Sequence, residues 1–222
     1  MMTEEAIRNS YQQDAAEPLY SILRAENKRG VYVQYVKRSM DLLLSVIGLI
    51  AAAPIIAVFA AAIILESPGS AFYIQERVGL MGRSFKVIKL RSMVKNAEAN
   101  GFQWATKNDS RVTRVGAFIR KTRIDELPQL LNVIKGEMSI VGPRPERSYF
   151  TYQFNSEIPG FVNRLVVKPG LTGWAQVNGG YDITPKQKLE LDMHYIQKLS
   201  IWFDLLILTK TVRVIFTGEG AR

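Results

Sequence analysis

Residues 42–65 read LLLSVIGLIAAAPIIAVFAAAIIL, and this apolar stretch limits the folds that are open to the chain. None of its side chains carries a charge. At about 1.5 Å per residue, a helix of this length would extend about 36 Å, which exceeds the roughly 30 Å hydrocarbon core of a bilayer. The rest of a 222-residue chain could hardly bury so long an apolar helix. The stretch therefore predicts a helix that enters a membrane.

Pro54 lies near the middle of this stretch. Proline lacks the amide donor and clashes with the preceding turn, so it kinks or breaks a helix into arms that are each too short to cross. Basic residues, which favour the cytoplasmic side, flank both ends of the stretch. They are Arg24, Lys28, Arg29, Lys37 and Arg38 before it and Arg77, Arg83 and Lys86 after it. We therefore predict a re-entrant hairpin over residues 37–70, with a kinked single span as the alternative.

The composition narrows the kind of partner and the kind of chemistry. A net charge of +9 implies an anionic partner, such as nucleic acid, an anionic membrane surface or a phosphorylated substrate. The chain has no cysteine and one histidine, His194. Neither a thiolate metal site nor a Ser-His-Asp triad is therefore expected.

The acidic pair Asp125-Glu126 is set among cations. Within residues 109–147 it follows Arg111, Arg114, Arg120, Lys121 and Arg123 and precedes Arg144 and Arg147. A carboxylate can attack phosphorus when cations or a divalent metal ion neutralise the phosphoryl group, so the pattern suggests chemistry on phosphate. An ordinary helix start ahead of Pro128 is the alternative, because acids also complement the positive end of a helix.

The segment Gly142-Pro143-Arg144-Pro145 favours the phosphate hypothesis. Each proline fixes its own φ and restricts the residue before it, so the backbone of Arg144 has lost most of its freedom. A guanidinium held in this way loses less entropy when it clamps a phosphate through paired hydrogen bonds. A stiff surface turn is the alternative.

Two glycines, Gly79 and Gly82, divide residues 72–91 into short extended segments. The second segment ends in Lys89 and Arg91. These two residues either add to the phosphate-binding cations or occupy a solvated strand edge.

The glycines and proline of residues 168–176 specify a loop. In this loop Trp174 could stack on a base or sugar and Gln176 could hydrogen-bond to it. Such a tryptophan more often anchors a loop against the core.

A helix is predicted to begin at Thr184-Pro185, which supply a cap and a first-turn proline. Within it Asp192 lies four residues after Lys188, a spacing typical of a surface ion pair. The last helix, at about 201–216, could pack in the core or lie on the membrane.

Several segments, in this order, resemble the bacterial sugar transferases, that is, the monotopic polyprenyl-phosphate phosphoglycosyl transferases. They are Lys37-Arg38 with Asp41 ahead of the apolar stretch, then QERVGLMGRSFKVIKLRSM, RVTRVGAFIRKTRIDELPQLLNVIKGEMSIVGPRP and KPGLTGWAQVNG. The similarity covers residues 36–222.

The resemblance implies an α/β, mainly helical, membrane-associated catalytic domain at residues 71–222, with interfacial helices, on the cytoplasmic face of the bacterial inner membrane. A re-entrant helix–break–helix hairpin and an N-terminal arm at residues 1–36 would precede it. The implied reaction transfers a sugar 1-phosphate from a UDP-sugar to undecaprenyl phosphate with Mg²⁺ as cofactor, as the first membrane step of exopolysaccharide, capsule, O-antigen or glycoconjugate synthesis. Implied partners are inner-membrane lipids, downstream glycosyltransferases and a second copy of the chain, and not nucleic acid.

The resemblance also assigns roles to residues. It makes Asp125 the nucleophile, which would form a covalent phosphosugar intermediate and release UMP, with Glu126 beside it to hold the metal or orient the nucleophile. Both carboxylates are therefore candidate Mg²⁺ ligands. The predicted substrate-binding residues are Lys89, Arg120, Arg144 and Asp192 from the resemblance, with Arg91 and Gln176 added from the residue patterns.

Two features depart from the family pattern: the chain has Ala53-Pro54 where many members have Ser-Pro, and its arm is short where larger relatives carry several spans. No motif identifies the sugar. On the residues alone, a membrane adaptor that binds anionic lipid or a partner enzyme is the alternative function. The uncharged stretch argues against a nucleic-acid-binding protein.

Overall fold

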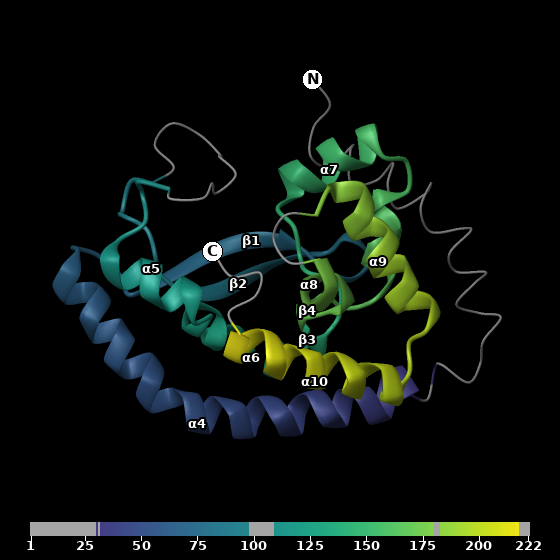
Figure 1. Ribbon diagram of the computed structural model, residues 1–222, viewed down its shortest axis with the longest axis horizontal. Coiled ribbons are helices and arrows are strands. Elements are labelled where there is room, and N and C mark those ends of the chain that lie inside the picture. The colour runs from purple at the N-terminus through teal and green to yellow at the C-terminus, as the bar shows by residue number, and fades with distance from the viewer. Residues whose placement is uncertain (1–29, 31, 98–108, 180–182, 218–222) are drawn as a thin grey trace.

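The computed structural model describes residues 30, 32–97, 109–179 and 183–217, without the side chains of 215–217. Most of the predicted arm, residues 1–29 and 31, therefore lies outside the described residues. One long helix runs along the lower edge of the molecule, and the shorter helices and strands lie above it (Figure 1). The described residues thus form the expected mainly helical α/β arrangement with a long apolar N-terminal helix.

The long helix α4 (Lys37–Glu66) follows a π-helical turn, η1 (Tyr32–Val36). It continues through Pro54, where the prediction placed a break, and it curves upward toward its C-terminal end (Figure 1). A proline removes one backbone hydrogen bond, and here the helix bends rather than stops. The continuous segment Tyr32–Glu66 is long and apolar enough to cross or enter a membrane, and only 11% of its most apolar window is buried.

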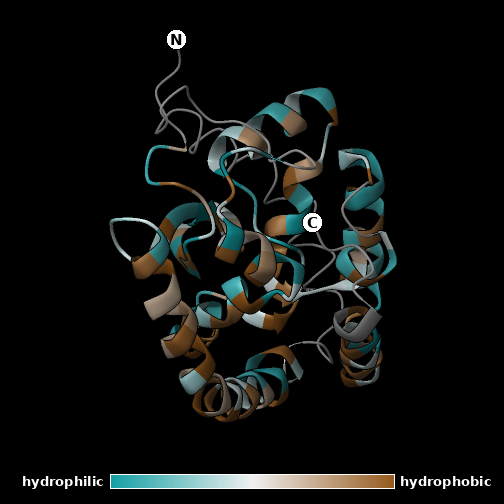
Figure 2. Ribbon diagram, turned by 60° about the vertical axis from the view of Figure 1, so that its left-hand side comes forward, coloured by the Kyte–Doolittle hydropathy of each residue, from teal (hydrophilic) through white to brown (hydrophobic). Residues whose placement is uncertain are grey.

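One stripe of α4 packs against the rest of the protein. Its buried residues recur every turn or two, at Lys37, Asp41, Ser45, Ala52 and Ile63. The other faces expose large apolar side chains, so hydrophobic residues cover most of the helix in Figure 2. These are Leu42, Leu43, Leu44, Val46, Ile47, Ile50, Ile55, Val58, Ile64 and Leu65. An apolar surface of this extent is typical of contact with lipid.

Strands β1 (Phe72–Val78) and β2 (Ser84–Leu90) pair as an antiparallel hairpin, which confirms the extended segments and their break. The turn contains a short 3₁₀ segment, η2 (Leu80–Gly82), in which Met81 and Gly82 both have positive φ. Asn132 covers part of β2, because its side chain accepts from the Ile88 amide and donates to the Lys86 carbonyl.

Helix α5 (Arg114–Lys121), the 3₁₀ segment η3 (Ile124–Gln129) and helix α6 (Leu130–Lys135) carry the acidic pair. Thr113 caps α5 by accepting from the Gly116 amide, and Glu66 at the end of α4 accepts from the Arg114 amide. Arg123, in the left-handed region at φ 57°, turns the chain from α5 into η3. This tight turn places the acidic pair directly after α5.

The remaining elements form the part of the molecule above the N-terminal half of α4 (Figure 1). Strand β3 (Ser139–Val141) pairs in parallel with β4 (Gly170–Thr172). The helical elements are α7 (Ser148–Glu157), η4 (Phe161–Val166), α8 (Trp174–Gly179), α9 (Pro185–Gln197) and α10 (Ile201–Thr217). The predicted start of α9 is confirmed, since Thr184 and Gln187 form a capping box.

Helix α10 packs in the core along one side and exposes apolar side chains along the other. Ile207 is fully buried in the core, whereas Trp202 is 78% exposed and Leu205 and Leu206 are also exposed. The larger core joins β2, α6, β3, α9 and α10, and a smaller one joins α4, β2 and α5. The acidic pair lies in η3, between α5 of the smaller core and α6 of the larger one.

Buried polar groups connect α4 to the elements above it. The Lys37 ammonium lies 2.5 Å from Asp204 of α10, which also accepts hydrogen bonds from the Tyr32 and Tyr195 hydroxyls. One turn further along α4, Asp41 accepts from the Ser139 hydroxyl at 3.0 Å and from the Ile140 amide at 2.9 Å. These contacts fix the position of β3 on the apolar helix.

We expect Asp204→Asn to cost about 3–5 kcal/mol of stability, because it leaves the Lys37 ammonium buried without a counter-charge. The midpoint of thermal unfolding, followed by tryptophan fluorescence in detergent, should fall by several degrees. Adding Lys37→Met should restore most of the loss, since the double variant has no unpaired charge. An unchanged midpoint in the single variant would show that the pair contributes nothing.

Candidate active site

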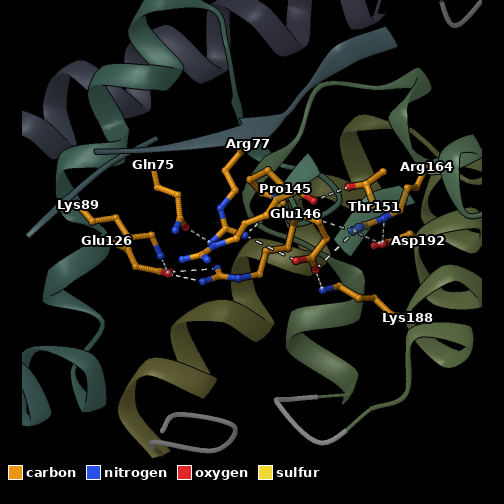
Figure 3. Close-up of polar contacts among 12 residues, drawn as sticks. Gln75, Arg77, Lys89, Glu126, Pro145, Glu146, Thr151, Arg164, Lys188 and Asp192 are labelled. Carbon is orange, nitrogen blue, oxygen red and sulfur yellow. Dashed lines mark hydrogen bonds and ion pairs between the residues drawn. The ribbon is translucent and has the colours of Figure 1, made fainter. Parts of the chain in front are cut away.

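The two carboxylates Asp125 and Glu126 stand in the first turn of η3, and each is 8% exposed. They are the acidic residues at the start of this 3₁₀ segment, as the alternative expected. Glu126 also points to Lys89 of β2 (Figure 3) and is bound by Arg144, so two cations from distant parts of the chain meet it. The pair is therefore more than an ordinary helix start.

Glu126 is held by a lysine on one side and an arginine on the other. Lys89 of β2 donates to Glu126 Oε1 at 2.8 Å. Arg144 donates to both oxygens, through a close contact to Oε1 and a bond of 3.3 Å to Oε2. Asp125 differs, because its carboxylate makes no direct hydrogen bond within the part of the chain that the structure describes.

The environments of the two carboxyl groups move their pKa values apart. Burial, together with the neighbouring Glu126 charge, raises the pKa of Asp125 to about 6, although the charges of Lys89, Arg144 and Arg120 oppose the rise. Burial also acts to raise the pKa of Glu126, but the charges of Arg144 and Lys89 outweigh burial and hold it well below its usual range. The two adjacent carboxyl groups thus differ in acidity: Asp125 is the one with the raised pKa, and Glu126 is the counter-charge of Lys89 and Arg144.

Residues 142–147, here called the Pro-Arg-Pro loop, deliver Arg144 to this site. The loop begins at a close backbone approach: a Cβ on Gly142 would lie 2.5 Å from the Lys168 carbonyl oxygen, so only glycine fits. The loop then passes to Glu146, which is buried, and to Arg147, which precedes α7. The stiff segment is therefore a packed loop whose arginine reaches the acidic pair and not a free surface turn.

A second cluster of charges lies beside the loop (Figure 3). Glu146 makes a close ion pair with Lys188, and its carboxylate also lies 3.6 Å from Arg77 and 4.0 Å from Arg164. Burial acts to raise the pKa of Glu146, but these three cations hold it at about 2. Because the three cations surround a carboxylate, they are part of the protein's internal structure rather than a bare phosphate site.

The predicted pair of Lys188 with Asp192 is wrong. Asp192 is 1% exposed and binds Arg164, whose Nε and NH2 atoms lie 2.9 Å and 2.6 Å from Asp192 Oδ2. Lys188 turns to Glu146 instead. The α9 spacing brought the two residues to one face, but the tertiary fold supplied each with a closer partner.

Three other predicted residues occupy different places. Arg120, at the end of α5, is close enough for its charge to lower the pKa of Asp125. Arg91 is buried and donates to the Ser67 and Pro68 carbonyls at 2.8 Å and 2.7 Å, so it secures the end of α4 rather than joining the site. Gln176 lies over Gly173, beside the start of the Pro-Arg-Pro loop, and both polar atoms of its amide are buried without a hydrogen bond to any residue that the structure describes.

Trp174, at the start of α8, packs against His194 and Phe203, and the Lys210 ammonium lies over its ring. Its role in the fold is therefore to anchor the loop against the core, as its residue type favoured. The single histidine is part of the same aromatic cluster.

The sequence patterns missed Arg77, Glu146 and Arg164. Arg77 falls inside a segment that carries the resemblance and Glu146 directly follows one, but no pattern assigned a role to either residue. Arg164 carried no local signal, since it lies in a mixed segment of the sequence with no charged residue between Glu157 and Lys168 except itself.

The residues of the site could hold Mg²⁺ together with substrate phosphates, but not by themselves. Within residues 32–97, 109–179 and 183–217, no three His, Cys, Asp or Glu side chains gather as a metal-binding group. Mg²⁺ commonly binds through one or two carboxylates together with substrate phosphates. The acidic pair could supply the carboxylates. Both oxygens of Glu126 already accept from cations, so Asp125 is the freer ligand.

The geometry defines a class of protein: a membrane-associated protein with a buried, cation-bound carboxylate pair suited to phosphate chemistry. Comparison with known families makes the class more specific. The model of the bacterial sugar transferase family matches residues 32–218, so the chain belongs to this family.

Individual relatives agree with the family. The chain is 49% identical over 191 residues to a UDP-N-acetylgalactosamine-undecaprenyl-phosphate N-acetylgalactosaminephosphotransferase of Aeromonas hydrophila, covering 85% of the chain and 45% of the relative. It is 53% identical over 164 residues to a Bacillus subtilis (strain 168) protein provisionally named an undecaprenyl-phosphate N-acetylgalactosaminyl 1-phosphate transferase, covering 74% and 90%. It is 39% identical over 216 residues to a UDP-glucose:undecaprenyl-phosphate glucose-1-phosphate transferase of Xanthomonas campestris pv. campestris, covering 94% and 45%.

The chain thus spans about half the length of two of these relatives and most of the third. The matched part includes α4, the acidic pair and the Pro-Arg-Pro loop.

We expect Lys89→Met to raise the pKa of Asp125 above about 6, because one of the cations that favour its ionised form is lost. The measurement is an NMR titration of protein carrying ¹³C at the aspartate carboxyl carbons, without substrate or Mg²⁺, with Asp125→Asn to assign the signal. Lys86→Met is the matched control, because Lys86 is exposed on the same strand. A lower pKa in Lys89→Met would contradict this account of the site.

Proposed function

We propose that the protein transfers a sugar 1-phosphate from a UDP-sugar to undecaprenyl phosphate. The observation that carries the proposal is the contrast between two adjacent carboxylates: Glu126 is bound by Lys89 and Arg144, while Asp125 has a raised pKa and no such partner among the residues that the structure describes. The names of the relatives support the two substrates. A non-enzymatic adaptor would have no need of this contrast.

In the first step, an oxygen of Asp125 attacks the β-phosphorus of the UDP-sugar. The bond between the β-phosphorus and the oxygen that bridges to the α-phosphorus breaks, and UMP leaves with both electrons of that bond. The sugar phosphate then remains on Asp125 as an acyl phosphate. Arg144, Lys89 and Arg120 stand where they can offset the negative charge of the phosphoryl group.

In the second step, a phosphate oxygen of undecaprenyl phosphate attacks the same phosphorus. The bond to the Asp125 oxygen breaks, which restores the carboxylate and gives undecaprenyl diphosphate sugar. Glu126 keeps its charge throughout, since its pKa lies well below its usual range. Its role is to hold Lys89 and Arg144 around the reacting phosphoryl group.

Mg²⁺, held by Asp125 and the diphosphate with Glu126 beside it, would neutralise charge on the leaving phosphate. Every other contribution comes from the residues of the chain. Gln176, whose amide is buried beside the loop without a partner among the described residues, is a candidate contact to the UDP-sugar. Asp192 is almost fully buried, so its effect on the UDP-sugar would be indirect.

The proposed setting is the cytoplasmic face of the bacterial inner membrane, with α4 inserted as a re-entrant hairpin bent at Pro54. Support for insertion comes from the exposed apolar faces of α4 and from the exposed Trp202 on α10, which suits the interface, and Pro54 is where the helix would bend further to form the hairpin. This placement keeps the acidic pair near the level of the lipid phosphates. The reaction would then be the first membrane step of polysaccharide or glycoconjugate synthesis.

The donor to test first is UDP-N-acetylgalactosamine. The relatives at 49% and 53% identity are named for N-acetylgalactosamine, whereas the glucose-named relative from Xanthomonas is 39% identical. UDP-glucose, UDP-galactose and UDP-N-acetylglucosamine complete the panel.

We expect purified protein with Mg²⁺ and its donor, but no lipid acceptor, to release at most one UMP per chain and to gain the mass of one sugar phosphate. Asp125→Asn should show neither. Asp109→Asn is the control, because it neutralises another aspartate of the same stretch, one that pairs with Arg111 and not with the residues around Asp125, and it should behave as wild type. UMP release that requires the acceptor, with no mass gain, would favour direct transfer; membrane binding with no turnover for any donor would favour the adaptor.

We expect kcat/KM to fall about tenfold per pH unit below about pH 6, because this parameter reports the free enzyme and Asp125 must be ionised to attack. An aspartate with the usual pKa of 3.8 would keep the enzyme active to about pH 4. Steady-state rates between pH 4.5 and 8 in buffers of constant ionic strength provide the measurement. A plateau down to about pH 4.5 would show that the attacking group is not perturbed.

A further inference from the structure

The Pro-Arg-Pro loop is held along its whole backbone. Its two prolines have no amide donor, so its carbonyl oxygens depend on donors from elsewhere. Each carbonyl oxygen of residues 143–146 accepts a hydrogen bond. The Pro143 carbonyl accepts from the Gly170 amide at 2.9 Å, and the Glu146 carbonyl accepts from the Val78 amide at 2.9 Å. The two carbonyls between them accept from side chains.

Those two side chains are guanidinium groups. Arg164 donates to the Arg144 carbonyl at 2.7 Å, and Arg77 donates to the Pro145 carbonyl at 3.1 Å. The guanidinium of Arg144 itself meets Glu126. The backbone carbonyl and the side chain of Arg144 are thus held by different partners.

Asp192 determines the position of Arg164. It binds Arg164 through Nε and NH2, and the NH2 group is the one that also reaches the Arg144 carbonyl. The two side chains are 2% and 1% exposed. An ion pair that is so deeply buried has little access to a substrate. Because the Arg164 NH2 group bonds both the Asp192 carboxylate and the Arg144 carbonyl, the pair instead holds the loop in position.

We propose that Arg164, held by Asp192, is a positioning residue that sets the place of Arg144 through its backbone carbonyl. This inference rests on the proposed function, because the effect of the position is on the phosphoryl transfer. It gives Asp192 a role that differs from substrate contact: the carboxylate orients Arg164, Arg164 fixes the loop, and the loop presents Arg144 to the phosphate. Glu146 supports the same loop by holding Arg77 and Lys188.

The test compares Arg164→Lys with wild type in rapid-quench measurements of UMP formation from UDP-N-acetylgalactosamine. Lysine keeps the charge but has one nitrogen, so it cannot reproduce the fork that joins Asp192 to the Arg144 carbonyl. We expect the rate constant of the burst to fall about 10- to 100-fold while the Kd for the donor stays within about threefold. Asp192→Asn should act in the same direction.

Arg111→Lys is the matched control. Arg111 also joins an aspartate, Asp109, to a backbone carbonyl, that of Ala97, but away from the Pro-Arg-Pro loop. Its variant should keep the wild-type burst. A drop equal to that of Arg164→Lys would show a general effect on folding and would overturn the proposal.

A second readout does not depend on turnover. Modification of Arg144 by phenylglyoxal, followed by peptide mass spectrometry, should be faster in Arg164→Lys and Asp192→Asn than in wild type, because Arg144 is released from Glu126. Unchanged modification, or a weaker Kd with an unchanged burst rate, would overturn the proposal and indicate direct substrate contact. If wild type forms no UMP with any donor, the proposed function fails, and the modification rates alone decide the positioning role.

Discussion

An apolar helix is joined to this protein through buried polar contacts, and the site depends on that connection. Lys37 of α4 meets Asp204 of α10, and Asp41 binds both Ser139 and Ile140 of β3. An unpaired charge is costly to bury, so α4 cannot slide along the domain without losing these partners. The long apolar helix is therefore held in register with the strand that leads into the Pro-Arg-Pro loop.

The position of β3 in turn fixes the loop that reaches the acidic pair. β3 ends at Val141, the close contact at Gly142 starts the Pro-Arg-Pro loop, and the loop carries Arg144 to Glu126. On the other side, β2 brings Lys89 to the same carboxylate. Two rigid elements thus converge on Glu126, whereas Asp125 makes no direct hydrogen bond within the described residues, and the pKa values of the two adjacent carboxyl groups therefore move in opposite directions.

The charged groups packed against the Pro-Arg-Pro loop hold it through further polar contacts. Arg77, Arg164 and Lys188 lie against the carboxylates of Glu146 and Asp192, so most of the charge in this cluster is offset internally while it holds the loop. A second set of cations, Lys89, Arg144 and Arg120, acts on the pKa of Asp125. A chain of net charge +9 therefore places some of its cations in a structural network and others around the acidic pair.

The sequence by itself determined the features that depend on neighbouring residues: the apolar helix, the hairpin broken at Gly79 and Gly82, the capped start of α9 and the constrained Pro-Arg-Pro segment. It also marked Asp125, Glu126, Lys89 and Arg144 through motifs that resemble a known family. Only the tertiary structure decided which charges meet. Asp192 pairs with Arg164 instead of Lys188, Arg91 secures the end of α4, and α4 continues through Pro54. Backbone preference and hydrophobic pattern act over a few residues, whereas a buried charge takes its partner from whichever distant element the packing brings within reach.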